Sequence, residues 1–338
     1  MNKITCLLFG IALLTSCSMM HEDLDECPLR ITLRYDYNTK QANMFHDHVE
    51  EATVYVVDPQ TGIVVDQLTA RNSNDAQPLR SPSFAFVFTG LNAGDYRLYA
   101  TGRSAADAHP VINAPATGQA ISTLTFALPA AADGNVAAQR MDTVWNTLKP
   151  TTVTMTESAP AEAVVPLMRL TNDLNVMIFR RDADLDNSHE RYDVRVEAHH
   201  PRLGYDNEPL SDDAVTYRPF AAWTTETDTT STRAAIAERN AHYDLSLGRL
   251  FAHNDARQNA RLIITDRTTG KEVVNIDLCY YLALARNYFE TQHYTTQEYL
   301  DREYDYRLDF GIEGSTWKTL SIHINILSWA IRLQNEDL

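Results

Sequence analysis

Leu29-Arg30-Ile31-Thr32-Leu33-Arg34-Tyr35 alternates apolar and polar side chains over seven consecutive positions. Alternation with period two and one apolar face indicates a β-strand that is buried on one side. The stretch opens directly after Cys27-Pro28, and similar stretches follow it along the chain. The sequence therefore predicts a mainly β protein.

Short strand-like stretches recur in both halves of the chain, with turn residues between them. They cover residues 52–57, 63–68, 84–88, 97–100, 122–128, 151–156, 164–178, 192–198, 243–247, 261–265, 273–278, 304–310, 317–326 and 329–333. The turns at 58–62 and 266–271 predict two hairpins, and the two glycines in 90–96 predict a third, between 84–88 and 97–100. Such series of short strands are typical of β-sandwiches.

Few segments depart from the strand pattern. Val136 to Thr147 is predicted as one short helix or a long loop, and Gln297 to Glu303 as one or two helical turns. In the latter, Asp301-Arg302-Glu303 is interpreted as a surface or structural charge pair. The polar, Thr-rich stretch from Thr224 to Arg233 is predicted as a surface loop.

The best candidate for a domain boundary is Glu157-Ser158-Ala159-Pro160-Ala161-Glu162, where apolar alternation stops at small, polar and Pro residues. The length of 338 residues suggests two domains of about 150 residues each. We therefore expect an N-terminal β-sandwich over 28–158 and a C-terminal β-sandwich over 159–338.

Composition excludes some classes of partner. The net charge of −16 argues against nucleic acid, because phosphate binding depends on Lys and Arg. It also argues against electrostatic adhesion to an anionic bilayer. Of the four cysteines, Cys27 and Cys279 are too few for a disulfide framework. They could pair or remain free thiols, and we favour unpaired thiols.

The N-terminus carries an export signal. Lys3 precedes a short apolar run that ends in Leu14-Thr15-Ser16-Cys17. A basic residue, an apolar core and small residues at the exit describe a secretory signal, and this run is too short for a membrane span. Leu, two small residues and Cys are similar to a bacterial lipobox, so residues 1–16 are predicted as a lipoprotein signal peptide. The lipid would attach to Cys17, and residues 17–27 would form a polar tether.

Several pieces along the chain together resemble one family, the FimB-like anchor subunits of the type V fimbriae of Bacteroidales. The pieces are the lipobox at Cys17, Asp25-Glu26-Cys27-Pro28 with the strand after it, Val54-Tyr55-Val56-Val57-Asp58, Met168-Arg169-Leu170-Thr171-Asn172, Gln297 to Glu303, Ile322 to Trp329, and Ile331-Arg332. The resemblance implies two tandem transthyretin-like sandwiches. It also implies a lipid-anchored subunit that fixes the base of a fimbria to the outer membrane, exposed at the cell surface.

The resemblance implies stalk subunits as partners, joined by β-strand addition. In related stalk subunits a protease removes an N-terminal strand, and a neighbour's strand fills the groove. Here the first strand begins about ten residues after Cys17, so cleavage after Arg30 or Arg34 would sever the anchor. We therefore expect this chain to keep its first strand. Whether it donates a C-terminal segment, accepts a strand elsewhere or docks by a surface stays open.

No catalytic motif stands out in the sequence, so we expect no enzyme and no cofactor. Nucleophile elbows, zinc-protease motifs and phosphate-binding glycine loops are missing. His46-Asp47-His48 and His199-His200 could ligate a metal, but no further ligand is indicated, and solvated or structural roles are favoured.

The alternative function is a surface glycan-binding lipoprotein. An exposed Trp platform would favour it, and only Trp145 and Trp223 of the four Trp lie outside regular strand patterns.

Overall fold

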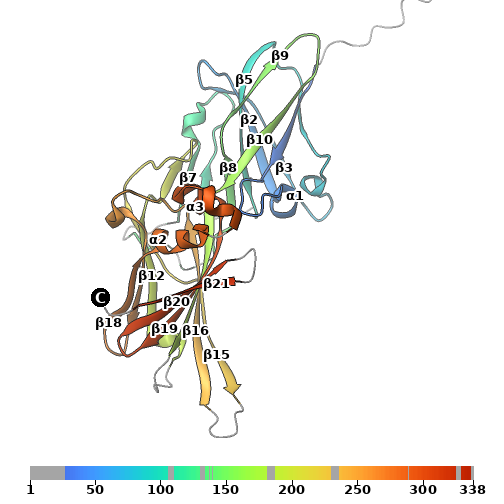
Figure 1. Ribbon diagram of the computed structural model, residues 1–338. Helices are drawn as coiled ribbons and strands as arrows, with labels where there is room; N and C mark the ends of the chain where they lie inside the picture. Colours follow the sequence, from blue (N-terminus) through green and yellow to red (C-terminus); the bar gives the residue numbers. More distant parts are fainter. Residues whose placement is uncertain are drawn as a thin grey trace, which may run out of the picture.

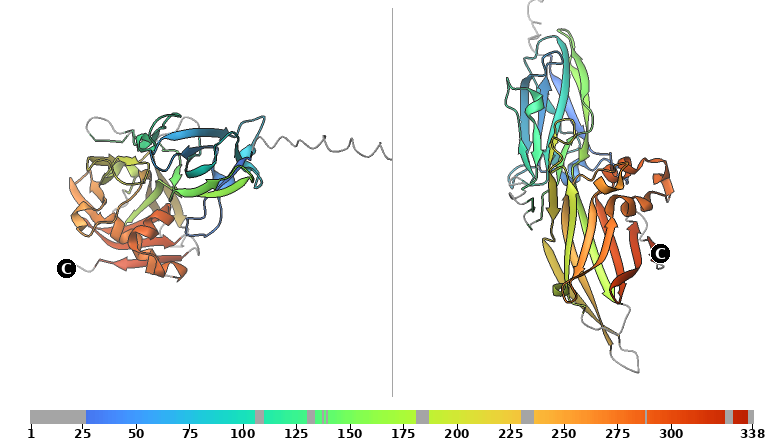
Figure 2. Two further views of the ribbon diagram at one scale, coloured as in Figure 1. Left: turned by 90° about the horizontal axis from the view of Figure 1, so that it is seen from above. Right: turned by 90° about the vertical axis from the view of Figure 1, so that its left-hand side faces the viewer.

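A computed structural model describes residues 27–105, 110–129, 134–136, 138, 140–180, 187–229, 236–287, 289–324 and 329–335. Cys17, the predicted signal peptide and the predicted tether up to residue 26 lie outside these residues. The described chain is mainly β, and its two halves are stacked end to end in an elongated molecule (Figure 2). The prediction of a mainly β, sandwich-like protein is confirmed.

The N-terminal half is built from one eight-stranded sheet. In chain order its strands are β1 (Leu29–Arg34), β2 (Glu51–Val57), β3 (Val64–Arg71), β4 (Phe86–Phe88), β5 (Gly94–Arg103), β8 (Val144–Thr147), β9 (Thr151–Met155) and β10 (Ala161–Arg169). The spatial order is β3-β2-β5-β8-β10-β1-β4, with β9 also on β5. The sheet folds over a core that includes Ile31, Val54, Trp145 and Val165, each at most 1% exposed.

The C-terminal half is a sandwich of two sheets. The larger contains β11 (Thr171–Arg180), β15 (Ala221–Thr229), β16 (Ile236–Gly248), β19 (Asp305–Glu313), β20 (Thr316–Ile324) and β21 (Trp329–Gln334), in the order β15-β16-β11-β19-β20-β21. The smaller contains β12 (Tyr192–His199), β14 (Ala214–Tyr217), β17 (Arg261–Asp266) and β18 (Lys271–Asp277). Side chains such as Val176, Leu308, Val196 and Ile264 fill the space between them.

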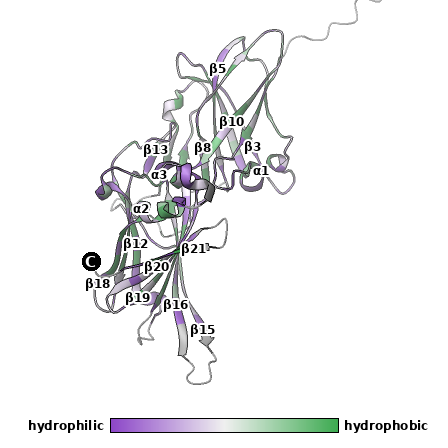
Figure 3. Cartoon of the chain, viewed as in Figure 1, coloured by the Kyte–Doolittle hydropathy of each residue, from purple (hydrophilic) through white to green (hydrophobic). Residues whose placement is uncertain are grey.

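The two halves share structure where they meet. A three-stranded sheet joins β6 (Val111–Asn113) and β7 (Thr125–Ala127) to β13 (Arg202–Gly204), which comes from the second half of the sequence. Helices α2 (Leu278–Ala283) and α3 (Thr296–Arg302) lie beside this junction (Figure 1). Figure 3 shows that α2 is largely hydrophobic and α3 largely hydrophilic. The remaining helical segments are α1 (Phe45–His48) and 3₁₀ turns at Pro78–Arg80, Ile121–Thr123, His189–Arg191, Ala256–Gln258, Leu284–Asn287 and Phe289–His293.

Two predicted hairpins are confirmed and the third is wrong. β2 pairs with β3 and β17 with β18 across the predicted turns. After Gly90 to Tyr96, however, β5 pairs with β2, β8 and β9, while β4 pairs with β1. Gly90 and Gly94 have φ values of +76° and +154°, which favour glycine, and they let the chain leave β4 for another part of the sheet.

The change from one half to the other falls at Leu170, and not at the predicted boundary between residues 158 and 159. β10 lies beyond that boundary, yet it pairs in parallel with β1 and antiparallel with β8. Its Val165 and Leu167 are fully buried in the N-terminal core. Pro160 therefore marks only the turn that leads into β10, and the next strand, β11, is the first of the C-terminal sheet.

Three local predictions also have clear outcomes. The helical turns at 297–303 are confirmed as α3, with Thr295 as N-cap. The stretch from Val136 to Thr147 contains no helix among its described residues and ends in strand β8. The Thr-rich stretch from Thr224 is not a loop at its start, because β15 runs to Thr229 and pairs with β16. Threonine is β-branched and favours a strand when a neighbour offers hydrogen bonds.

Candidate functional site

The first strand is an integral part of the N-terminal core. β1 lies between β4 and β10, and Leu29, Ile31 and Leu33 are 0%, 0% and 4% exposed. The Cys27 thiol donates a hydrogen bond to the Glu157 carbonyl at 3.5 Å, so the described chain begins beside the β9–β10 turn. From there β1 runs in parallel with β10 toward the junction. The chain thus enters the fold at the end farthest from the C-terminal half (Figure 1).

The junction is held by a buried network around α3. Arg249 makes a two-pronged ion pair with Asp301, at 2.7 and 2.8 Å, and also donates to the Asn207 carbonyl at 2.6 Å. Asn207 Nδ2 in turn donates to the carbonyl of Thr147 in the N-terminal half, at 2.8 Å. The guanidinium of Arg302 lies 4.0 Å from the centre of the Tyr37 ring. These contacts tie helix α3 to both halves of the molecule.

Glu303 completes this network on the N-terminal side. It is 7% exposed, and its carboxylate accepts hydrogen bonds from the Thr39 hydroxyl and from the backbone N–H groups of Tyr304 and Asp305. Burial raises the pKa of the Glu303 carboxyl above its usual value, although these three donors oppose the shift. Of the two roles predicted for Asp301-Arg302-Glu303, the structural role therefore agrees with the contacts. The residues lie at an internal junction and not on an open surface.

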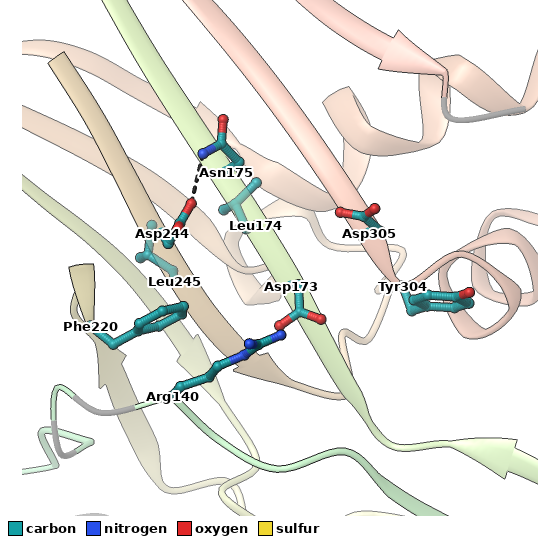
Figure 4. Close-up of a pocket in the computed structure, with 9 residues that line it drawn as sticks. All are labelled: Arg140, Asp173, Leu174, Asn175, Phe220, Asp244, Leu245, Tyr304 and Asp305. Atoms are coloured by element: carbon teal, nitrogen blue, oxygen red, sulfur yellow. Dashed lines mark hydrogen bonds between the residues drawn. The ribbon is translucent and has the colours of Figure 1, made fainter. Parts of the chain in front are cut away.

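A pocket of about 320 Å³ opens on the outer face of the six-stranded sheet, next to the junction (Figure 4). Its lining includes three carboxylates, an amide, one guanidinium and two aromatic rings. The lining residues are Arg140, Asp173, Leu174, Asn175, Phe220, Asp244, Leu245, Tyr304 and Asp305. This volume is within the ~300–1,000 Å³ range of small-molecule sites.

The acidic residues of the pocket come from three neighbouring strands. Asp173 on β11 is the register partner of Asp305 on β19, and Asn175 is the partner of Asp244 on β16. Asp173 accepts a hydrogen bond from Arg169 at 2.7 Å, and Asp244 accepts one from Asn175 at 2.6 Å. Desolvation and the nearby Asp173 carboxylate raise the pKa of Asp305.

A partly exposed aromatic pair lies on the same face of the sheet. Trp223 on β15 is 38% exposed and stacks on His242 of β16, with ring centroids 5.1 Å apart and planes 5° apart. Thr225 Oγ1 lies 2.9 Å from His242 Nε2 and fixes the imidazole. Burial and the nearby Arg307 lower the pKa of His242, which favours the neutral ring. His242 and Asp244 point to the same face because they are two positions apart on one strand.

The predicted candidate residues are scattered, and most have structural partners. His46 Nδ1 lies 2.7 Å from the Leu79 carbonyl, and His200 Nδ1 lies 2.9 Å from the Ser211 carbonyl. Within the described ranges, no group of three or more His, Cys, Asp or Glu residues could hold a metal ion. Cys27 and Cys279 form no disulfide, and burial raises the pKa of the Cys279 thiol to about 12. No described helix has the length and apolar character needed to cross a membrane.

The pocket itself was missed at the sequence level. Its acidic residues are far apart in the chain, and only the sheet register of β11 with β16 and β19 brings them together. A local signal did exist, since Asp173 and Asn175 alternate with apolar residues and so mark the polar face of a strand. Of the two Trp outside regular patterns, Trp145 is 1% exposed and Trp223 lies at the surface.

A comparison with models of protein families gives a match over most of the chain. The sequence model of the family described as fimbrillin-A associated anchor proteins Mfa1 and Mfa2 matches residues 24–335. No curated protein sequence matches the chain.

Several solved structures of other proteins have a similar fold over nearly the whole length of this chain. A protein of Bacteroides thetaiotaomicron provisionally assigned as polysaccharide-binding is 24% identical, with a TM-score of 0.74 and coverage of 93% of this chain and 100% of that one. A provisionally assigned adhesin of the same organism is 22% identical, with a TM-score of 0.75 and coverage of 90% and 98%. The fimbrial anchor protein Mfa2 of Porphyromonas gingivalis is 15% identical, with a TM-score of 0.59 and coverage of 90% and 99%. By its sequence match, this chain belongs to the family of fimbrillin-A associated anchor proteins Mfa1 and Mfa2.

Proposed function

We propose that this protein is a lipid-anchored subunit that fixes the base of a fimbria to the outer membrane and takes part in its assembly. The observation that carries the proposal is the position of β1. It is an internal strand of the N-terminal sheet, between β4 and β10, with Leu29 and Ile31 fully buried. Membership in an anchor family and the lipobox-like Leu14 to Cys17 support the same function.

A retained first strand suits a basal subunit. Cleavage after Arg30 or Arg34 would remove buried side chains and separate the body from Cys17. A tether at residues 17–27 would join the fold at the end farthest from the C-terminal half, so that half would project away from the membrane. Stalk subunits would then meet the exposed half, by strand addition or by surface docking. The role is structural, and no enzymatic step belongs to it.

We also propose that the two halves are transthyretin-like sandwich domains in tandem. The division would lie at Leu170, where the chain changes sheets, with β13 of the second domain completing a sheet of the first. Limited proteolysis of the purified protein should then give a stable N-terminal fragment that ends after β10. A stable fragment that ends near Pro160 would contradict this division, because such a fragment would lack β10.

The anchor proposal is tested by Cys17→Ala in cells. Two acyl chains bury many CH₂ groups at about 0.8 kcal/mol each, which is enough for stable anchoring. The substitution should release the protein from the membrane fraction and shed assembled fimbriae into the medium. Ser16→Ala, which keeps a small residue before the cysteine, is the matched control and should leave the protein membrane-bound.

The outcomes of this experiment separate the two parts of the proposal. Protein that stays in the membrane fraction despite Cys17→Ala would contradict lipid anchoring. Released protein with fimbriae still on the cells would keep lipid anchoring and contradict the basal role. The alternative of glycan binding concerns a different part of the molecule and is argued separately below.

A further inference from the structure

The outer face of the six-stranded sheet combines a concave polar pocket with an exposed aromatic ring. The pocket is lined by Asp173, Asp244, Asp305 and Asn175, which are hydrogen-bonding side chains, and by the rings of Phe220 and Tyr304. Trp223 lies beside it on the same face, since Ala221 is the register partner of Asp244 and Trp223 that of His242. Successive same-face positions on a strand are about 7 Å apart.

Trp223 is an exposed aromatic residue held in a defined orientation. It is 38% exposed, and one side of its ring stacks in parallel on His242, with centroids 5.1 Å apart. Thr225 holds the imidazole in place through His242 Nε2. An aromatic face carries negative charge density and attracts the polarised C–H groups of a pyranose ring. The stack therefore orients Trp223 as a platform for a sugar ring.

The pocket supplies acceptors for hydroxyl groups. An ionised carboxylate has about four lone-pair sites. Asp173 accepts from Arg169 and Asp244 accepts from Asn175 through one side-chain contact each, which leaves acceptor capacity on both. Bonds from a hydroxyl to a carboxylate are charge-assisted and about twice as strong as neutral ones. Carboxylate and amide groups beside an aromatic ring are a chemistry that recognises the hydroxyls of a sugar.

The charge of the pocket limits the class of saccharide. Three carboxylates line it against one guanidinium, that of Arg140, in a protein of net charge −16. An acidic sugar would bring a further negative charge close to Asp173 and Asp305, and like charges at short range are unfavourable. We propose that this face binds a neutral oligosaccharide, with one ring on Trp223 and the next in the pocket at Asp173, Asp244 and Asp305.

The test uses the purified full chain and named soluble polysaccharides. Affinity electrophoresis would compare mannan, dextran, galactan, xyloglucan and arabinoxylan with the acidic polymers alginate, polygalacturonate and chondroitin sulfate. We expect at least one neutral polymer to retard the protein and the acidic polymers to have no effect. Trp223→Ala and Asp244→Ala should each weaken that retardation at least tenfold. Tyr280→Ala, which truncates another exposed aromatic residue at 57% exposure on α2, should leave it unchanged.

Folding and competing partners are checked in the same experiment. Trp223→Phe keeps an aromatic ring and should retain part of the binding, and all variants should unfold within about 2 °C of the parent. Retardation by no neutral polymer, by acidic polymers alone, or equally by Trp223→Ala and the parent would overturn the proposal. Binding of a polylysine peptide without binding of neutral polymers would assign the carboxylates to a basic protein partner and also overturn it. This site does not rest on the anchor function, and its readout is independent of lipidation.

Discussion

The junction and the outer face of the six-stranded sheet both contain several charged side chains. Those at the junction are buried, whereas those on the outer face are accessible to water. At the junction, Arg249 and Asp301 have side chains that are only 11% and 7% exposed, and they bind each other through two hydrogen bonds. On the outer face, Asp305 and Trp223 are exposed to water beside a pocket. The junction uses charge to fix two halves of one chain, whereas the outer face keeps polar groups accessible to another molecule.

Physical chemistry accounts for this difference. Removing one partner of a buried pair leaves an uncompensated charge in a poorly solvated place, which costs about 3–5 kcal/mol. At an exposed position water replaces the lost partner, so the cost is a few tenths of a kcal/mol. Stability should therefore be sensitive to substitutions at the junction, and binding should be sensitive to substitutions on the outer face.

The largest effect is expected for Arg249→Ala. The substitution leaves Asp301 without its ion-pair partner and the Asn207 carbonyl without its donor, and it removes the guanidinium 4.7 Å from the centre of the Phe251 ring. Urea unfolding should show a loss of about 3 kcal/mol. Arg257→Ala removes an ion pair with Asp255 whose side chains are 89% and 45% exposed, and it should leave the unfolding midpoint unchanged. A loss below about 1 kcal/mol in Arg249→Ala would show that the junction does not depend on this pair.

A smaller effect that depends on pH is expected at Glu303. Glu303→Ala removes the acceptor of three hydrogen bonds and should cost about 1–3 kcal/mol. Glu303→Gln keeps an acceptor for the Tyr304 and Asp305 N–H groups, and its amide can donate to the Thr39 hydroxyl. Because burial raises the pKa of Glu303 above its unfolded value, the folded parent loses stability as pH rises from about 4.5 through the folded pKa.

The Gln variant has no such titration, so it should gain stability relative to the parent between pH 4 and pH 7. Urea unfolding of the parent and of both variants at several pH values measures this difference. A stability difference between Glu303→Gln and the parent that stays constant with pH would contradict a raised pKa at this position.

The sequence predicted β1, the two hairpins at 58–62 and 266–271, and helix α3, because local alternation and turn chemistry specify them. It failed at β10 and at the connection from β4 to β5, where the choice of partner strand is decided by core packing across long sequence separations. Pro160 has the local signature of a domain boundary. The boundary is not there, because Val165 and Leu167, which follow Pro160, are buried in the N-terminal core. The outer-face pocket could not be predicted for the same reason, since Asp173, Asp244 and Asp305 meet only through sheet register.

The smallest effect is expected at Asp305 on the outer face, and it has the opposite sign. Desolvation and the Asp173 carboxylate raise the pKa of Asp305, so its ionised form is slightly unfavourable in the folded protein at neutral pH. Asp305→Asn should therefore stabilise the protein by a few tenths of a kcal/mol, a shift of about 1 °C in Tm, since water screens an exposed charge. The gain should disappear below about pH 3.8, where the parent carboxyl is protonated in both states.

The same substitution also removes charge-assisted acceptors from the pocket, so it should weaken retardation by a neutral polysaccharide. Functional sites often retain groups that cost stability, and a variant that is more stable but binds less is the signature of such a site. Scanning calorimetry and affinity electrophoresis on one preparation of Asp305→Asn measure both quantities. If the variant were less stable than the parent at pH 7, Asp305 would be a structural residue like those of the junction, and the contrast between the two regions would not extend to this position.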